Sequence, residues 1–448
     1  MKIKSKNSLF VCSLVGSLFF ATASAAAESD NGKTDQLEQR IKVLEQQLKT
    51  LDTELKKTIL ESSAAESSAA ESSAPEVVLG ESFSDNLRTK MSTHGFASAA
   101  IAVSDTEGTY AGGTINEDPN TQNDSVVGIQ TDFLLSPKAE FVVQIIGRGN
   151  DKFDADISWA FLHYKLQPRL SLRAGRLRVP FFINSEYLEV GYTYPWVRPP
   201  QEVYSTSFND YEGFDVNYEI IRDPWRLLLQ GYYGRGYLSR STSVGALDKS
   251  KGVSLRLTNG PWLARMSYYS ANISTDFSGG AAAINQALAS LNQEQFVLDH
   301  DPTSFTTFGF AYDDGKWWVM AEASIAQLTG IFDATHAHYL SVGYQFGPWL
   351  PYYTYAKRYT ADDEGFNQTA AALTQSGIPE YQPYAASVAG AVSQQESGTL
   401  GVRYNLSPNI ALKVAYQHFY DFNESKGQFS KDPGDNVDML TFVVDVVF

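Results

Sequence analysis

The sequence predicts an all-β fold, a 16-stranded antiparallel transmembrane β-barrel, preceded by an N-terminal coiled-coil helix. Three observations support this fold class. Apolar and polar residues alternate along many segments, short and long connections alternate between those segments, and aromatic residues gather at one end of them. This combination is typical of barrels whose strands face lipid on one side and a lumen on the other.

Residues 1–27 have the anatomy of a secretory signal peptide. Lysines begin it, residues 9–20 form an apolar run, and small residues precede Ala27. The apolar run is too short to span a bilayer. Cys12 is the one cysteine of the chain and lies in this segment. We therefore expect a mature chain without a disulfide or a thiolate metal site.

A heptad pattern lies in residues 28–60. Its apolar seam repeats at spacings of four and three, at Leu37, Ile41, Leu44, Leu48, Leu51 and Leu55. Such a seam predicts a short coiled coil, because a and d residues of one helix pack between those of another. A lone amphipathic helix is the alternative. Residues 61–90 repeat Glu-Ser-Ser-Ala-Ala and contain few large apolar residues, which indicates a linker.

Residues 91–448 read as strands joined by unequal connections. Seven short connections are rich in turn-forming residues: 136–138, 167–169, 222–224, 259–261, 313–316, 347–348 and 407–409. Long polar stretches lie between them, as extracellular loops alternate with periplasmic turns in bacterial barrels. Seven turns join seven strand pairs, and a first and a last strand complete sixteen, with both termini on the turn side.

Two features favour a membrane barrel over a soluble β-sandwich, which would also show alternating strands such as Phe214, Val216 and Tyr218. The first is a group of tryptophans that directly follow turns, where an interfacial aromatic girdle is expected. They are Trp225, Trp262, Trp317, Trp318 and Trp349. The second is the C-terminus, which alternates up to a terminal phenylalanine through Phe442, Val444, Val446 and Phe448. It resembles the signal by which outer-membrane assembly machinery recognises its clients.

The order of signal peptide, heptad helix, linker and barrel resembles the DcaP-like porins of Gram-negative bacteria and, more loosely, the phosphate-selective porins. The resemblance implies a homotrimer in the cell outer membrane, surrounded by lipid and lipopolysaccharide, with the coiled coil in the periplasm. It also implies a third loop that folds into the pore. The third long loop here, about residues 178–212, is dense in aromatic residues and prolines, which favours an ordered loop. The expected function is therefore passive diffusion of small hydrophilic solutes.

The alternation places more bases than acids on the lumen wall. The inward bases are Arg148, Lys165, Arg173, Arg226, Arg256, Arg265, Lys357, Arg403 and Lys413. The inward acids are Asp132, Glu140, Asp215, Glu219, Glu322 and Asp445. The whole chain carries a net charge of −16, so most of the acid is expected in loops and turns. A basic wall favours anions; the alternative is that the wall charges only neutralise one another.

We expect the pore lining and its constriction to contain eight residues: Arg173, Arg176, Arg178, Glu186, Arg198, Glu202, Arg256 and Arg403. Arg176 and Arg178 share the parity of the lipid-facing Leu170 and Leu172. A bulge, or the passage into the loop, must therefore turn both arginines inward.

No catalytic, cofactor or metal motif emerges. No glycine-rich phosphate loop appears. None of the histidines lies in a recognisable nucleophile motif; they are His94, His163, His300, His336, His338 and His418. We expect no enzyme activity, no cofactor and no nucleic-acid partner. The alternative function is a non-conducting barrel that acts as an adhesin or tethers the envelope, with the helix bound to peptidoglycan. A plugged barrel would need apolar filling, whereas the inward positions read as mostly polar, glycine or charged.

Overall fold

A computed structural model describes residues 90–448 apart from 207, 241–242, 276–300, 328–333, 362, 378–381, 383–384 and 386–391. The chain divides into two units, Met1–Gly80 and Glu81–Phe448. The predicted signal peptide and coiled-coil helix, and the predicted linker up to residue 89, lie outside the described residues.

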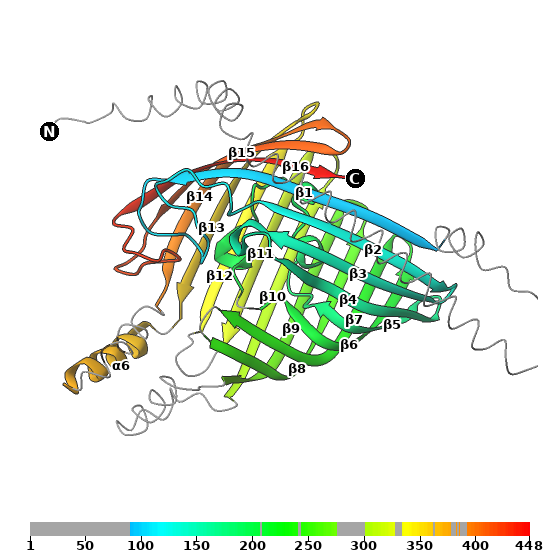
Figure 1. The fold of residues 1–448 in the computed structure, drawn as a ribbon, viewed down its shortest axis with the longest axis horizontal. Helices are drawn as coiled ribbons and strands as arrows, with labels where there is room; N and C mark the ends of the chain where they lie inside the picture. The colour runs from blue at the N-terminus through cyan, green and yellow to red at the C-terminus, as the bar shows by residue number, and fades with distance from the viewer. Residues whose placement is uncertain are drawn as a thin grey trace, which may run out of the picture. The chain divides into compact units, whose positions relative to one another are not determined.

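The described part of the chain is built around sixteen strands (Figure 1). In chain order they are β1 Met91–Ser104, β2 Val126–Ser136, β3 Ala139–Arg148, β4 Ala155–Gln167, β5 Leu170–Arg178, β6 Asp210–Arg222, β7 Trp225–Arg240, β8 Ser243–Asn259, β9 Trp262–Thr275, β10 Asp301–Asp313, β11 Trp317–Gln327, β12 Thr335–Tyr344, β13 Trp349–Thr360, β14 Gln394–Ser407, β15 Ile410–Tyr420 and β16 Asn436–Val447. Short helices lie in the connections: η1 Gly149–Asp151, η2 Ser185–Tyr187, η3 Gly191–Thr193, α4 Gln201–Tyr204 and α6 Asp363–Gln375.

Each strand pairs antiparallel with its neighbours in sequence, and β1 pairs with β16, so the sheet is a closed barrel. At the seam Phe96 lies opposite Val447, and Ala100 lies opposite Val443. The amide of Gly95 donates to the Phe448 carbonyl at 2.7 Å, and the Phe448 amide donates back at 2.9 Å. Closure leaves no strand edge unpaired, as a sheet surrounded by lipid requires.

All seven predicted short turns join consecutive strands, from β2–β3 to β14–β15. The predicted all-β class, strand number and closure are therefore confirmed. β1 begins and β16 ends at the turn end of the barrel (Figure 1). Helix α6 lies in the long β13–β14 connection and was not predicted. Within the described residues, no helix has the length and apolar character needed to cross a membrane.

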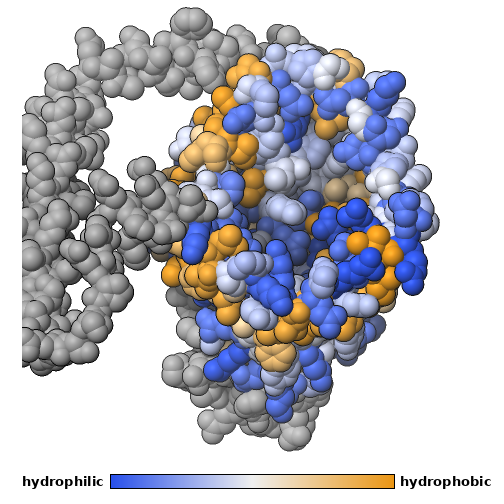
Figure 2. Space-filling view, turned by 90° about the vertical axis from the view of Figure 1, so that its right-hand side faces the viewer, coloured by the Kyte–Doolittle hydropathy of each residue, from blue (hydrophilic) through white to orange (hydrophobic). Residues whose placement is uncertain are grey.

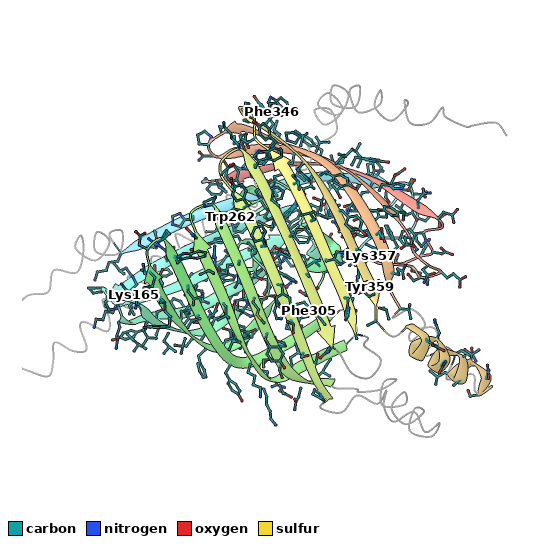
Figure 3. All side chains as sticks on the ribbon, turned by 180° about the vertical axis from the view of Figure 1, so that it is seen from behind. Lys165, Trp262, Phe305, Phe346, Lys357 and Tyr359 are labelled. Carbon is teal, nitrogen blue, oxygen red and sulfur yellow. The ribbon has the colours of Figure 1, made fainter. Side chains whose placement is uncertain are left out.

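The outer face carries the apolar side chains. On β6, Phe214 and Tyr218 are 47% and 46% exposed, whereas Asp215 between them is fully buried in the lumen wall. Four of the five turn-following tryptophans are also exposed: Trp225, Trp262, Trp317 and Trp349. Trp262 lies at the turn end of its strand (Figure 3). Trp318 corrects the prediction, because it points inward and is only 7% exposed.

Lys357 also corrects the predicted wall. On β13 the buried Tyr352, Thr354 and Ala356 face inward, so Lys357 faces outward. Its ammonium lies 2.7 Å from the carboxylate of Glu396 on β14, near the loop end of the barrel (Figure 3). The inward count therefore becomes eight bases against six acids, a smaller excess than the sequence suggested.

Candidate functional site: a loop inside the barrel

The long connection between β5 and β6, residues 179–209, lies against the inner wall; we call it the inner loop. It contains η2, η3 and α4, and its contacts reach β9 to β16 as well as β1 and β3. Its four prolines restrict the backbone, and its eight aromatic side chains supply large apolar surfaces. The loop is thereby an ordered part of the interior.

Aromatic packing holds one side of the inner loop. Trp196 is 2% exposed, and its ring lies 5.0 Å from that of Trp318 and 5.5 Å from that of Tyr339. Its indole N–H donates to the hydroxyls of Ser341 and Thr354 at 3.0 and 3.1 Å. The loop and the inner faces of β3–β13 thus share one apolar cluster. This corrects the expectation that the inward positions are mostly polar, glycine or charged.

Wall cations bind the backbone of the inner loop. The Lys413 ammonium donates to the carbonyls of Gly191 and Trp196 at 2.6 and 2.8 Å. Arg403 donates to the carbonyl of Tyr192 at 2.6 Å, and Arg265 donates to that of Phe182 at 2.7 Å. These cations therefore position the loop and have little freedom to bind a passing solute.

Buried carboxylates of the wall also help to hold the inner loop. Glu322, 3% exposed, accepts hydrogen bonds from the Ile183 amide and the Tyr339 hydroxyl, each at 2.7 Å, and also from the Tyr204 hydroxyl. Asp445 lies 2.7 Å from the ammonium of Lys413 and completes a fully buried ion pair.

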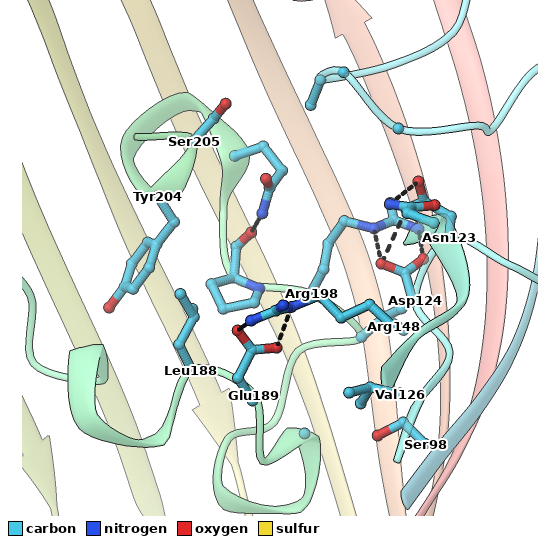
Figure 4. Close-up of a pocket in the computed structure, with 18 of the residues that line it drawn as sticks. Ser98, Asn123, Asp124, Val126, Arg148, Leu188, Glu189, Arg198, Tyr204 and Ser205 are labelled. Atoms are coloured by element: carbon cyan, nitrogen blue, oxygen red, sulfur yellow. Dashed lines mark hydrogen bonds and ion pairs between the residues drawn. The ribbon is translucent and has the colours of Figure 1, made fainter. Parts of the chain in front are cut away.

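An arginine pair binds a carboxylate of the inner loop. Glu189 accepts from Arg148 Nη2 at 2.7 Å and Nε at 3.3 Å (Figure 4). It also accepts from Arg178 Nη2 at 2.8 Å. Burial alone would raise the pKa of Glu189, but the two guanidiniums outweigh it and lower the pKa to about 2. Glu189 is therefore ionised at neutral pH.

A second arginine ties the inner loop to the first loop, residues 105–125. Arg198 donates two hydrogen bonds to Asp124, at 3.0 and 2.7 Å (Figure 4). It also donates to the Thr441 hydroxyl at 2.8 Å. Because both side chains of this pair are about a tenth exposed, the Arg198 charge is neutralised at the site itself.

Two of the cavities inside the barrel lie on opposite sides of the inner loop. The cavity on the loop side has a volume of about 390 Å³ and is lined by Ser98, Arg148, Leu188, Glu189 and Gly191 among others. The cavity on the turn side has a volume of about 410 Å³ and is lined by residues that include Phe96, Gln130, Gln144 and Val190. Figure 2 shows the turn end of the barrel, which is hollowed and largely hydrophilic inside the hollow. Both cavities border the inner wall of β1–β3.

Five of the predicted site residues contact the inner loop, belong to it or face the lumen. Arg178, Arg198 and Arg403 contact the inner loop or belong to it, Arg173 pairs with Asp215 at 2.7 Å, and Arg256 has the inward parity of the buried Ser254. Glu186 lies in η2 and makes no ion pair with any described residue.

Arg176 and Glu202 do not line the lumen. Arg176 lies opposite Glu212, two positions beyond the pair that Ala174 forms with the exposed Phe214, so both side chains face outward. No bulge turns Arg176 inward, which corrects that expectation. Glu202 lies in α4 of the inner loop, where it is fully buried and accepts from the Gln395 amide at 2.9 Å.

No local sequence signal marks Arg148 and Glu189 as partners, because the pair joins β3 to a loop residue 41 positions away. Within the described residues, no group of three or more His, Cys, Asp or Glu side chains could hold a metal ion. His336 Nδ1 lies 3.1 Å from the Tyr359 hydroxyl, and His300 lies outside the described residues.

No protein-family model and no curated protein matches the sequence. Solved structures do match. OmpF of Salmonella typhi, in complex with daunomycin, is 12% identical with a TM-score of 0.52, covering 80% of this chain and 97% of its own. OprB of Pseudomonas putida at high pH is 13% identical with a TM-score of 0.49, covering 82% of this chain and 97% of its own. The outer-membrane channel DcaP of Acinetobacter baumannii is 11% identical with a TM-score of 0.48, covering 80% of this chain and 97% of its own. The likeness to OmpF shows a shared fold.

Proposed function

From the fold of the outer-membrane porins, we propose that this protein is a channel through which small hydrophilic solutes diffuse across the outer membrane. The observation that carries the proposal is the pair of cavities on opposite sides of the inner loop, both against the inner wall of β1–β3. A loop folded into a closed barrel narrows the lumen without filling it, which is the arrangement that a size-selective diffusion pore needs.

Planar-bilayer recording of the purified full-length protein tests this proposal. We expect discrete conductance steps from protein whose band shifts on heating, the behaviour of a folded barrel. A folded barrel that gives no steps at any voltage contradicts the channel. The same result would favour the alternative, a non-conducting barrel with an adhesive or envelope-tethering role. One observation favours that alternative, namely the aromatic packing between the inner loop and the wall.

We infer a weak preference for small anions, smaller than the sequence count of wall charges implied. Arg148, Arg173 and Lys413 are each paired with a carboxylate. Lys165, Arg226 and Arg256 keep inward parity and form no ion pair with any described residue. Three such charges raise the local anion concentration only modestly.

The reversal potential across a potassium chloride gradient measures this preference. Arg226→Gln/Arg256→Gln is expected to move the wild-type value toward cation selectivity. Arg222→Gln is the control, because Arg222 is exposed beside the β6–β7 turn. A cation-selective wild type would refute the preference.

We propose a homotrimer as the assembled form. The outward faces of β16, β1, β2 and β3 contain no tryptophan or tyrosine, whereas β7, β9, β11 and β13 each carry an exposed tryptophan. A flank without interfacial aromatic residues suits contact with protein better than contact with lipid headgroups. The expected Leu37–Leu55 seam would reinforce the trimer from the periplasm, and docking to peptidoglycan is its rival role. Native mass spectrometry of wild type and of a chain lacking 30–76 separates these roles.

We place the protein in the outer membrane, in contact with lipid and lipopolysaccharide. The apolar outer face supports this location, and the alternating C-terminus, Phe442 to Phe448, supports assembly by the outer-membrane machinery. We propose no enzymatic role. Cell fractionation tests this location, and we expect to recover the protein in outer-membrane vesicles.

A further inference from the structure

The inner loop is attached in two different ways around the wall. Toward β9–β15 it is held by buried aromatic packing and by cations that bind backbone carbonyls, as at Lys413 and Arg403. Toward β3 and β5 it shares the apolar cluster with Val142 and Leu177, and its polar attachment there is one side chain, Glu189, which binds Arg148 and Arg178. A polar attachment through a single side chain is the easier one to break, because no backbone hydrogen bond is lost with it.

The segment that carries Glu189 separates the two cavities. Leu188, Glu189 and Gly191 line the loop-side cavity, and Val190 lines the turn-side cavity. The opposing wall is also continuous, since Ser98 borders the first cavity and Phe96, on the same inward face of β1, borders the second. A small displacement of residues 188–190 away from β1–β3, with Gly191 kept in place by Lys413, would therefore join the two cavities.

Both guanidiniums have another carboxylate within reach. Arg148 Nη1 lies 3.9 Å from Asp156, and Arg178 Nε lies 3.5 Å from Asp210. Arg178 also donates to the Ser158 hydroxyl at 2.9 Å. Departure of Glu189 thus leaves neither arginine as an uncompensated charge, which would otherwise oppose opening. Glu189 itself would move toward the open cavity, where water can solvate it.

We propose that Glu189 is a latch: its ion pairs with Arg148 and Arg178 hold residues 188–190 against the wall, and their rupture opens the passage between the loop-side and turn-side cavities. This inference rests on the proposed function, because it concerns the route by which the channel conducts. It identifies the side of the inner loop along which solutes pass.

Single-pore recordings of the full-length wild type, Glu189→Gln and Glu212→Gln test the latch. Glutamine keeps the shape of the side chain and removes its charge. Loss of the two ion pairs is expected to raise the ratio of high- to low-conductance dwell times by about tenfold or more in Glu189→Gln. Glu212→Gln is the matched control, since Glu212 faces outward on β6 and its replacement removes the same charge away from the inner loop. Equal dwell-time ratios in all three proteins would overturn the latch.

A second measurement does not depend on conduction. Val190→Cys, alone and combined with Glu189→Gln, is reacted with a small membrane-impermeant maleimide added from the loop side. The wild-type chain, with Cys12 as its one cysteine, is the blank. Labelling about tenfold faster in the double variant is expected. Faster labelling of a barrel that shows no conductance would retain the latch and reject the channel. Conduction with unchanged labelling and unchanged dwell times would retain the channel and reject the latch.

Discussion

Replacement of Trp196 by alanine should release the inner loop while the barrel stays folded. The indole is 2% exposed and packs against Trp318 and Tyr339. Removing a buried tryptophan costs about 3–5 kcal/mol. Ser341 and Thr354 remain satisfied, because their hydroxyls bond to each other at 2.7 Å. The cost therefore arises mainly from lost packing. It lowers the docking equilibrium of the loop by about a hundredfold or more, at ~1.4 kcal/mol per factor of ten.

The assay is limited chymotrypsin digestion of the folded protein, followed by conductance recording. Faster cleavage within 179–209 and a larger mean conductance are expected for Trp196→Ala, with the β-sheet circular dichroism unchanged, since no strand pairing involves Trp196. Trp196→Phe is the matched control. It keeps one aromatic ring and loses the indole donor, worth about 1 kcal/mol, together with the smaller ring of the indole, so faster cleavage than wild type but slower than Trp196→Ala is expected. A Trp196→Ala protein that resists cleavage and conducts like wild type would refute the reasoning.

Three further predictions address charge and closure. The pKa of Glu189, lowered from 4.5 to about 2, corresponds to about 3 kcal/mol that is fully present above pH 4.5 and is lost as the pH falls toward 2. Wild-type conductance should thus rise over that acidic interval, and Glu189→Gln should show no such rise. Lys413→Met leaves Asp445 buried without its cation and should destabilise the barrel by about 3–5 kcal/mol. Lys413→Met/Asp445→Leu should destabilise it less, as thermal unfolding in detergent would measure. Deletion of Phe448 removes two hydrogen bonds from the β1–β16 seam and should lower the temperature at which the folded band disappears on gels.

The strands and turns could be predicted from the sequence because their signals are local. A proline or a glycine marks every short turn, and period-two alternation on segments such as β6 distinguishes the lipid-facing side from the lumen. The seven turns also fixed the number of strands. None of these inferences requires knowledge of which distant residues meet.

The interior was less predictable because it depends on contacts between distant segments. On β13, aromatic or apolar residues occupy both parities, so the side that Lys357 takes is set by the neighbouring strands rather than by its own pattern. Trp318 follows a turn like the other girdle tryptophans, and only its contact with Trp196 distinguishes it. The role of wall cations such as Lys413 in holding the loop could not be inferred from charge alone.

The most direct test of the central claim is solute flux, measured by osmotic swelling of liposomes that contain the purified protein. With neutral sugars of increasing size, we expect rapid swelling for the smallest solutes and a steep decline for larger ones. Trp196→Ala should shift the decline toward larger sugars. Liposomes with correctly folded wild-type barrels that swell no faster than protein-free liposomes for every solute would contradict the account.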